Sequence, residues 1–226
     1  MKGMDQVIYF VRHGETTWNL EGRMQGHLDA PLTVRGLREA RRDGAALRAL
    51  IEGHEPYTMI FSPLGRTRET ARIIAEETRP HVHEERSDAR LREVSWGEWD
   101  GLTIAEIKEH YPELWQAHVE DRWNVGAPGG ECYRVLCERV ADWFASIEDE
   151  PRLIVVSHGA LGRALRGIYL GLAPDEVLQL REPQDALIRL TQGTVATIPT
   201  GPVPSEGESP VGADFVEKGR ARSGCG

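Results

Sequence analysis

The chain has 226 residues and a formal net charge of −9 at pH 7, with 40% hydrophobic and 28% charged residues. This length and balance are typical of one soluble globular domain with an ordinary core. The acidic charge argues against a nucleic-acid surface, which needs clustered Lys and Arg, but it allows a local cationic pocket for a small phosphorylated molecule.

The cysteines and the N-terminal residues indicate the cellular compartment in which we expect the protein. Cys132, Cys137 and Cys225 contain no C-x-x-C pair, so we expect neither a disulfide scaffold nor a thiolate zinc site. The apolar run before Arg12 has five residues, which is too short for a signal-peptide core or a membrane span. We therefore expect a cytoplasmic protein without a membrane partner, and the sequence leaves its oligomeric state open.

The stretch from Val7 to Glu15 reads V-I-Y-F-V-R-H-G-E. Its first five residues are β-branched or aromatic, which favours a short strand buried on both faces. Arg12, His13 and Gly14 follow where the strand must end. They place a guanidinium and an imidazole at the carboxyl end of an inner strand, the edge at which ligands bind in open α/β sheets. The alternative is a strand that simply stops at polar residues, and only the rest of the chain can decide.

Strand and helix signals alternate in the next part of the chain. Residues 16–32 are rich in Gly, Asn, Asp and Pro and lack a helical period, which predicts a long loop on the same edge as His13. Thr33 is the expected N-cap of a helix that ends before Gly53. The elements expected next are a strand at 59–61, a helix at 66–78 and a weakly signalled strand near Val82.

Residues 90–128 break this alternation and hold four of the six tryptophans, Trp96, Trp99, Trp115 and Trp123. Thr103 and Glu106 have the spacing of a capping box that begins a short helix, and Pro112 suits the first turn of another. We expect an inserted, mostly helical cover over the strand edge, from about residue 90 to 130. We interpret its tryptophans as packing residues rather than as a nucleotide cage.

The alternation resumes after the cover. Residues 131–147 have the apolar period of an amphipathic helix, whose expected buried side holds Val135, Leu136, Val140, Trp143, Phe144 and Ile147. Residues 153–157 predict another doubly buried strand, which ends in Ser157-His158-Gly159. A helix is expected over residues 160–169.

The sequence from residue 186 onward predicts an edge hairpin followed by a tail. Residues 186–190 and 194–198 alternate in hydrophobicity around Gln192-Gly193, as in a β-hairpin. Residues 201–226 are mostly Gly, Pro, Ser and Glu with few apolar side chains, which predicts a disordered tail. The sequence therefore predicts a single domain over residues 1–200.

Two of the predicted strands end alike, in Arg12-His13-Gly14 and in Ser157-His158-Gly159. In a parallel sheet wound with right-handed crossovers, both histidines reach one edge, where the turn after residues 59–61 adds Arg66. Guanidinium groups match phosphoryl oxygens, and a neutral imidazole among cations is a competent phosphoryl acceptor. These residues together indicate phosphoryl chemistry.

Six spaced motifs between Val7 and Ile198 resemble the histidine phosphatase superfamily, the group of phosphoglycerate mutases, fructose-2,6-bisphosphatase and broad-specificity phosphatases. The motifs are R-H-G-E-T-x-x-N from Arg12, G-R-x-Q-G from Gly22, D-x-P-L-T-x-x-G from Asp29, S-P-L-x-R-T-R-E-T-A from Ser62, L-R-E-x-x-x-G-x-W-x-G from Leu91 and S-H-G from Ser157. With the order of elements, the resemblance implies an α/β fold: a three-layer αβα sandwich with a mostly parallel central sheet, an antiparallel edge hairpin and a helical cover insertion.

The resemblance also implies a role for each matching residue. His13 is the expected nucleophile, which becomes phosphohistidine, and Glu93 is the expected acid that protonates the leaving oxygen and then activates water. Arg12, Arg66 and His158 are expected to bind the transferring phosphoryl group. The expected substrate-binding positions are Asn19, Gln25, Gly26, Gly159 and Ala160. No cofactor and no metal is expected.

Within this family, the segment around Glu93 reads R-E-V-S-W-G-E-W-D-G, which is closer to phosphatases than to the E-R-x-Y-G segment of mutases. The P-G-G-E-C run ending at Cys132 resembles a phosphatase P-x-G-E-S motif, and its cysteine puts a pocket hydroxyl in doubt. We therefore expect a metal-independent phosphomonoesterase acting on a small phosphorylated metabolite. Phosphoglycerate mutase activity and a non-catalytic phospho-ligand-binding module remain as alternatives. His81 and His83 share a strand face but have no evident third metal ligand.

Overall fold

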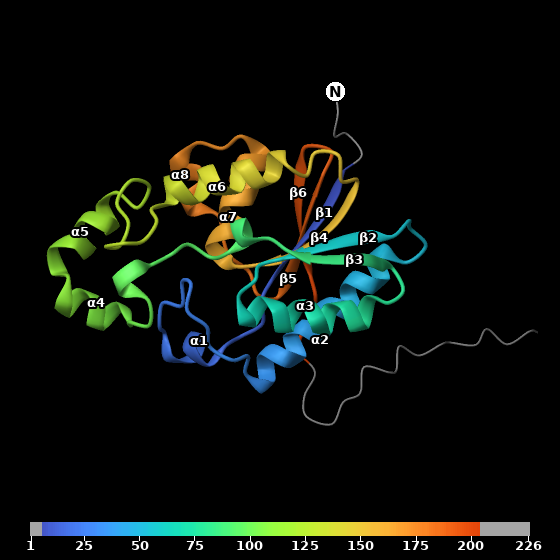
Figure 1. Ribbon diagram of the computed structural model, residues 1–226, viewed down its shortest axis with the longest axis horizontal. Helices are drawn as coiled ribbons and strands as arrows, with labels where there is room; N and C mark the ends of the chain where they lie inside the picture. The colour runs from blue at the N-terminus through green and yellow to red at the C-terminus, as the bar shows by residue number, and fades with distance from the viewer. Residues whose placement is uncertain (1–5, 204–226) are drawn as a thin grey trace, which may run out of the picture.

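The structure, a computed structural model, describes residues 6–203 and is built on one six-stranded sheet with the order β3-β2-β4-β1-β5-β6 (Figure 1). Strands β3, β2, β4 and β1 run parallel to one another. Strands β5 and β6 form an antiparallel hairpin, and β5 pairs with β1 in the antiparallel direction. The strands are β1 (Val7–Arg12), β2 (Tyr57–Phe61), β3 (Val82–Ser87), β4 (Arg152–Ser157), β5 (Ala186–Thr191) and β6 (Thr194–Pro199).

Helices cover both faces of the sheet, which confirms the expected αβα sandwich (Figure 1). One face carries α2 (Val34–Ile51) and α3 (Gly65–Thr78). The other carries α6 (Tyr133–Ala145), α7 (Gly159–Leu170) and α8 (Pro174–Gln179).

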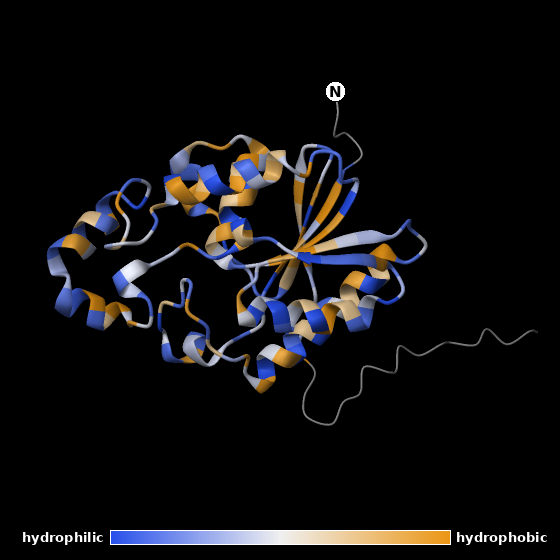
Figure 2. Cartoon of the chain, in the orientation of Figure 1, coloured by the Kyte–Doolittle hydropathy of each residue, from blue (hydrophilic) through white to orange (hydrophobic). Residues whose placement is uncertain are grey.

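The middle residues of β1 and β4 are apolar because these strands separate two cores. In β1, Ile8 and Phe10 belong to the core under α6 and α7, whereas Tyr9 and Val11 belong to the core under α2 and α3. Strand β4 divides its residues in the same way. A strand buried on both faces needs an unbroken apolar run, and Figure 2 shows hydrophobic residues in the middle of the central strands.

The cover extends beyond one end of the sheet (Figure 1). It consists of the 3-10 turns η1 (Ala89–Leu91) and η2 (Gly97–Trp99) and the helices α4 (Ile104–His110) and α5 (Pro112–Glu120). The expected capping box of Thr103 and Glu106 begins α4. Trp99 is fully buried, with its ring centroid 5.7 Å from that of Trp115, so this tryptophan is a packing residue, as predicted.

The structure differs from the sequence expectations at a few positions. The expected loop 16–32 contains the short helix α1 (Thr17–Glu21), whose N-cap Thr16 forms a capping box with Asn19. Five residues are too few to show a helical period, so the pattern of apolar residues could not reveal it. Val135 was expected on the buried side of α6 but is 37% exposed.

The part of the predicted tail from residue 204 onward lies outside the described residues. No helix within residues 6–203 combines the length and the apolar character needed to cross a membrane.

Candidate active site

The turn after β1 holds His13 at the carboxyl end of the inner strands. The backbone N–H of His13 donates to the Ser157 carbonyl at the end of β4 (2.9 Å). Gly14 and Gly36 pack so closely against backbone that a β-carbon on either residue would overlap the facing chain. This contact anchors the turn to the start of α2, and the His13 side chain is buried beneath it.

The hydrogen bond of the His13 ring determines which nitrogen is free. Its Nδ1 lies 2.8 Å from the Gly14 carbonyl oxygen, which can only accept, so Nδ1 carries the proton. Burial, followed by the charges of Arg66 and Arg12, lowers the pKa of His13 well below its ordinary value. The ring is therefore neutral at pH 7, with the lone pair of Nε2 available to attack an electrophile.

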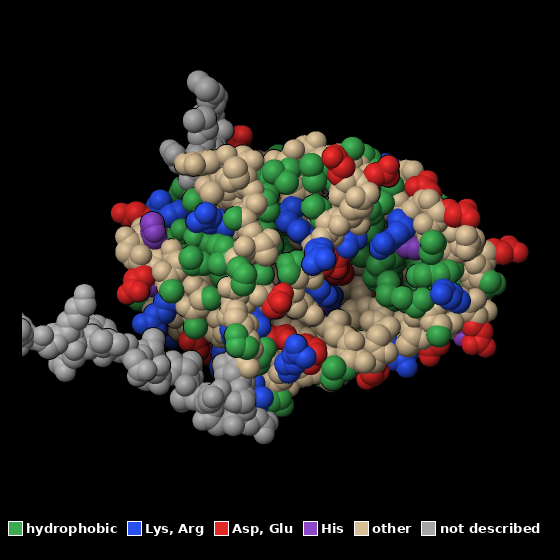
Figure 3. All heavy atoms as spheres, turned by 180° about the vertical axis from the view of Figure 1, so that it is seen from behind, with side chains coloured by type: hydrophobic (Ala, Val, Ile, Leu, Met, Phe, Trp, Pro, Cys, Tyr) green, Lys and Arg blue, Asp and Glu red, His purple; other side chains and the backbone are tan. Residues whose placement is uncertain are grey.

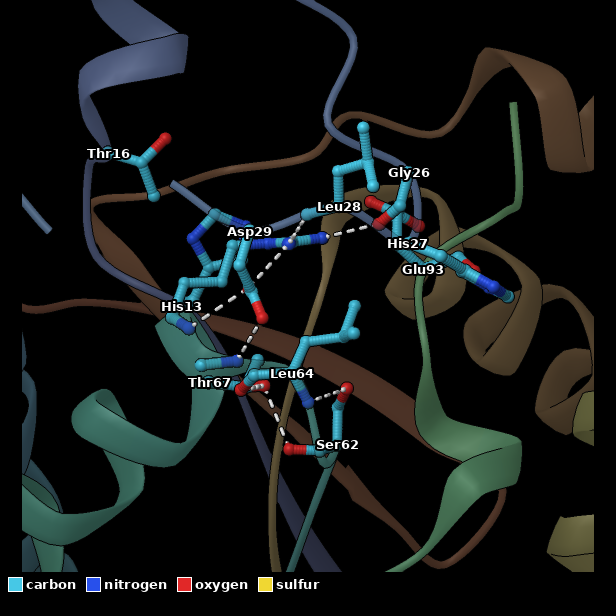
Figure 4. A network of polar contacts seen from close by, with 12 residues as sticks. His13, Thr16, Gly26, His27, Leu28, Asp29, Ser62, Leu64, Thr67 and Glu93 are labelled. Atoms are coloured by element: carbon cyan, nitrogen blue, oxygen red, sulfur yellow. Dashed lines mark hydrogen bonds and ion pairs between the residues drawn. The ribbon is translucent and has the colours of Figure 1, made fainter. Parts of the chain in front are cut away.

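Arg66, from the first turn of α3, is held by Gly26, Leu28 and Asp29 of the loop that follows α1, and Figure 4 labels these three residues. Its Nη2 donates to the Gly26 carbonyl (2.8 Å), and its Nη1 donates to the Leu28 carbonyl (2.8 Å) and to Asp29 Oδ1 (3.1 Å). The other carboxylate oxygen of Asp29 accepts from the Gly65 N–H (2.7 Å). Among residues 6–203 the buried Nε of Arg66 has no hydrogen-bond partner, which leaves its N–H available to an anion.

Removing the Asp29 carboxylate tests how far this network orients Arg66. We expect Asp29→Ala to lower kcat/KM for a phosphate monoester by about 10-fold, because a misplaced charge-stabilising group loses much of its effect. The matched control is Glu69→Ala, which removes an α3 carboxylate that pairs with Arg72 at the surface. Equal activity of the two variants would show that the Gly26 and Leu28 carbonyls alone hold Arg66.

His158 lies beside His13 beneath the cavity. It follows β4 as the N-cap of α7, and its ring centroid is 5.2 Å from that of His13. Its Nε2 is 2.8 Å from Ser62 Oγ, and within the described part of the chain its buried Nδ1 has no partner. Burial, then the charge of Arg66, lowers the pKa of His158 well below its ordinary value.

Arg12 and Glu93 complete the charged set. Arg12 donates from Nη1 to the Glu182 carbonyl (2.8 Å), and its Nε has no partner among residues 6–203. The Glu93 carboxylate accepts from the backbone N–H groups of Val94, Ala160 and Leu161 at 3.0 to 3.3 Å. The last two donors belong to the first turn of α7, so Glu93 lies at the N-terminus of that helix.

The backbone before Glu93 is held by Arg139 of α6. Its guanidinium donates to the carbonyl oxygens of Arg90, Arg92 and Glu93 at 2.6, 3.0 and 3.2 Å. Glu131 binds this guanidinium with both carboxylate oxygens, at 2.7 and 2.9 Å. The glutamate of the P-G-G-E-C run therefore positions the Glu93 loop. Cys132 is the N-cap of α6 and does not line the cavity, so its substitution for serine removes no pocket hydroxyl.

These groups surround one cavity of about 270 Å³, which opens on the face seen in Figure 3 as a hollow with basic and acidic side chains around it. The predicted residues that line it are Arg12, His13, Asn19, Gln25, Gly26, Arg66, Glu93 and Ala160. The other two predicted residues, His158 and Gly159, do not line it. The structure thus gathers residues from four separate motifs around one small space.

The predicted substrate-binding residues differ in whether their polar atoms already have hydrogen-bond partners within the protein. The amide oxygen of Asn19 accepts from the Thr16 N–H (3.0 Å) in the capping box of α1, so it is partly structural. The buried Oε1 of Gln25 has no partner within residues 6–203. The Gly26 carbonyl holds Arg66, and the Ala160 N–H contacts Glu93.

Besides Arg23 of the G-R-x-Q-G motif, four charged or polar lining residues were not predicted as site residues: Arg122, Tyr133, Arg163 and Glu182. Arg122 and Arg163 flank the Tyr133 ring, with their guanidinium carbons 5.7 and 5.6 Å from its centroid. Arg163 follows Gly159 by four residues and so shares a face of the predicted helix, a signal that could have identified it. The other three have no local signal in the sequence.

The titratable side chains do not suggest a metal centre. Over residues 6–203, no group of three or more His, Cys, Asp or Glu side chains could hold a metal ion. His83 lies exposed on the edge strand β3. The described site offers imidazole, guanidinium and carboxylate groups to a ligand.

Comparison with known proteins confirms the family that the sequence motifs predict. Residues 8–194 match the model of the histidine phosphatase superfamily (branch 1). A relative described as "Probable phosphoglycerate mutase GpmB" from Salmonella paratyphi C is 38% identical over 169 residues, which cover 73% of this chain and 75% of the relative.

Two solved structures share the fold. The mycobacterial glucosyl-3-phosphoglycerate phosphatase, solved in complex with VO3, has a TM-score of 0.67 and 29% identity, with 82% of this chain and 92% of that chain covered. The α-ribazole phosphatase from Shigella flexneri has a TM-score of 0.74 at 21% identity, with 87% and 96% covered.

Proposed function

The chain belongs to the histidine phosphatase superfamily (branch 1), and from this premise we propose that it is a phosphomonoesterase. Its substrate is a small phosphorylated metabolite, and hydrolysis proceeds through a phosphohistidine on His13. The observation that carries the proposal is the neutral His13 ring, whose free Nε2 shares a cavity with Arg12, Arg66 and the half-buried Glu93.

The first step transfers the phosphoryl group to the enzyme. Nε2 of His13 forms the new bond to phosphorus while the bond from phosphorus to the leaving oxygen breaks. The proton of the Glu93 carboxyl moves to that oxygen. Arg12 and Arg66 offer unpartnered guanidinium donors to the phosphoryl oxygens, which carry most of the charge in the transition state.

The second step releases phosphate. The Glu93 carboxylate takes a proton from a water molecule, whose oxygen bonds to phosphorus. The bond between phosphorus and Nε2 of His13 breaks, and its electron pair returns to the ring. Burial raises the pKa of Glu93, as does the charge of Glu182, which suits a group that must act as an acid and then as a base.

A phosphate-release screen tests this function. The panel comprises sugar phosphates, phosphoglycerates, nucleotides and phospholipid head groups, each assayed with and without a chelator. We expect release of inorganic phosphate from at least one class, at the same rate in chelator. Release that depends on added metal would contradict the proposed mechanism, and no release from any compound would favour a binding module.

Phosphoglycerate mutase activity is the second candidate, favoured by the description of the Salmonella relative. It also draws support from Arg122, which within residues 6–203 has no ion-pair partner and faces the cavity where a leaving group would lie. Such a guanidinium could bind a carboxylate. Incubation with 3-phosphoglycerate separates the two activities, because a mutase forms the 2-isomer without releasing phosphate.

Substitution of Arg122 tests whether the leaving group is anionic. If it carries a carboxylate, we expect Arg122→Gln to raise KM for 3-phosphoglycerate about 10-fold or more, the effect of one charge-assisted hydrogen bond. KM for p-nitrophenyl phosphate should change little. Arg134→Gln, on the exposed side of α6 and paired only with Glu138, serves as the control. Equal changes for both substrates would exclude a role in selecting acidic leaving groups.

A further inference from the structure

A second carboxylate, that of Glu182, faces the cavity beside Glu93. It comes from the segment between α8 and β5. A methyl group added at Gly159 would overlap Oε2 of Glu182 and would lie 3.3 Å from the guanidinium carbon of Arg12. The next residue, Ala160, donates its N–H to Oε2 of Glu93 (3.3 Å). Both carboxylates therefore lie at the first turn of α7.

Glu182 is held in place at both its backbone and its side chain. Its carbonyl accepts from Arg12, and Pro183 restricts its backbone to extended conformations. Its Oε1 pairs with Nη2 of Arg163 (2.9 Å). Arg163 is fixed in turn by the Leu180 carbonyl (2.9 Å) and the Tyr133 hydroxyl (2.8 Å). The carboxylate is therefore positioned and only 25% exposed.

The charges that face Glu93 come from several elements. Arg66 of α3 and Arg12 at the end of β1 favour its ionised form, while Glu182 opposes it. The uncharged His13 ring and the Tyr133 hydroxyl of α6 line the same cavity. Two carboxylates that share one half-buried site do not both ionise readily. Because Glu182 is paired with Arg163, Glu93 is the one that retains the proton.

We propose that Glu182 is a positioning residue that keeps the proton on Glu93 until the leaving oxygen accepts it. The inference rests on the proposed phosphatase function, in which Glu93 supplies that proton. As the bond from phosphorus to the leaving oxygen breaks, the proton passes from Glu93 to this oxygen. The new Glu93 carboxylate, beside Glu182, is then a stronger base toward the attacking water.

The pH dependence of Glu182→Gln tests the proposal. With phenyl phosphate, whose leaving group needs the proton, we expect the alkaline limb of the kcat/KM profile to move to lower pH. On that limb the variant should be about 10-fold less active than the parent, with a much smaller difference on the acid side. With p-nitrophenyl phosphate, a better leaving group, the change should be smaller. Glu52→Gln, an exposed residue after α2, should leave the profile unchanged.

Arg163→Gln should shift the alkaline limb of the kcat/KM profile in the direction opposite to Glu182→Gln. Without its cationic partner, the Glu182 charge acts on Glu93 uncompensated, so we expect the alkaline limb to move to higher pH. General damage to the pocket would lower activity in both variants without shifting the limbs in opposite directions. An unchanged limb in folded Glu182→Gln would overturn the proposal.

A spectroscopic measurement separates this proposal from the proposed function. In protein labelled with ¹³C at the glutamate carboxyl, the Glu93 resonance is the one missing from Glu93→Gln. Its titration midpoint should fall in Glu182→Gln and stay constant in Glu52→Gln. A shifted midpoint in a chain without phosphatase activity would refute the function and leave the coupling intact, whereas an active chain with no shift would refute the coupling.

Discussion

Alanine at His13 is expected to lower kcat/KM for phosphate monoesters by at least about 10⁴-fold, since it removes the nucleophile and thus the covalent route. No other described imidazole can replace it. His158 lies nearby, but its Nε2 is engaged with Ser62 and it does not line the cavity. The measurement is steady-state phosphate release, with circular dichroism to establish that the variant folds.

The covalent intermediate gives a direct readout of the same prediction. Rapid quenching of the parent protein with a ³²P-labelled substrate should trap one acid-labile phosphoryl group per chain, and His13→Ala should trap none. His110→Ala, an exposed residue at the end of α4, should behave as the parent protein does. Labelling of His13→Ala at the parent level would place the phosphoryl group on another residue and refute the mechanism.

Glutamine at Glu93 is expected to lower kcat/KM for phenyl phosphate by about 10²–10⁴-fold, the usual loss when a general acid is removed. Glutamine retains the size of the side chain, but it can neither give nor take the proton. Its amide can accept a hydrogen bond from the first turn of α7 through one oxygen only, whereas the carboxylate accepts there through both. A loss of activity could thus come from the altered hydrogen bonds as well as from the lost proton transfer. Comparing substrates whose leaving groups do and do not need a proton separates these two causes.

With p-nitrophenyl phosphate, whose departure needs no proton, Glu93→Gln should still form phosphohistidine. Hydrolysis of that intermediate should be slow, because no base activates the water. We expect a burst of one p-nitrophenol per chain followed by slow turnover, observed by stopped-flow absorbance. Equal losses for both substrates, without a burst, would show that Glu93 binds the substrate and does not transfer the proton.

The pKa shifts give the sign of the pH dependence. Glu93 must be protonated in the first step, so kcat/KM should be highest below its pKa and fall as the pH rises through it. Burial and Glu182 raise the pKa of Glu93, which moves this decline toward neutral pH. His13 must be neutral, and its lowered pKa keeps the ring available well into the acid range.

Much of the fold could be predicted from the sequence because its central strands are buried on both sides. Such strands require unbroken apolar runs, and those runs stand out at β1, β2 and β4. The short helix α1 could not be predicted from periodicity, since its stability depends on the local capping pair of Thr16 and Asn19. The exposure of Val135 depends on what covers α6, which no local pattern encodes.

The sequence by itself determined which residues end the inner strands, namely Arg12-His13 and Ser157-His158. Parallel strands bring their carboxyl ends to one edge, so the order of elements is enough to predict that these groups meet. Family motifs added Arg66 and Glu93 in the same way, each at a short and recognisable spacing. The proposed chemistry follows from these residues.

Only the tertiary structure decided what else surrounds them. Arg122, Tyr133 and Glu182 come from segments outside the matched motifs, and in the sequence each resembles an ordinary surface charge or core aromatic. Their effect depends on burial and on the charge opposite them, as the pairing of Glu182 with Arg163 beside Glu93 illustrates. Electrostatic interactions between distant segments arise only when folding removes water from between them.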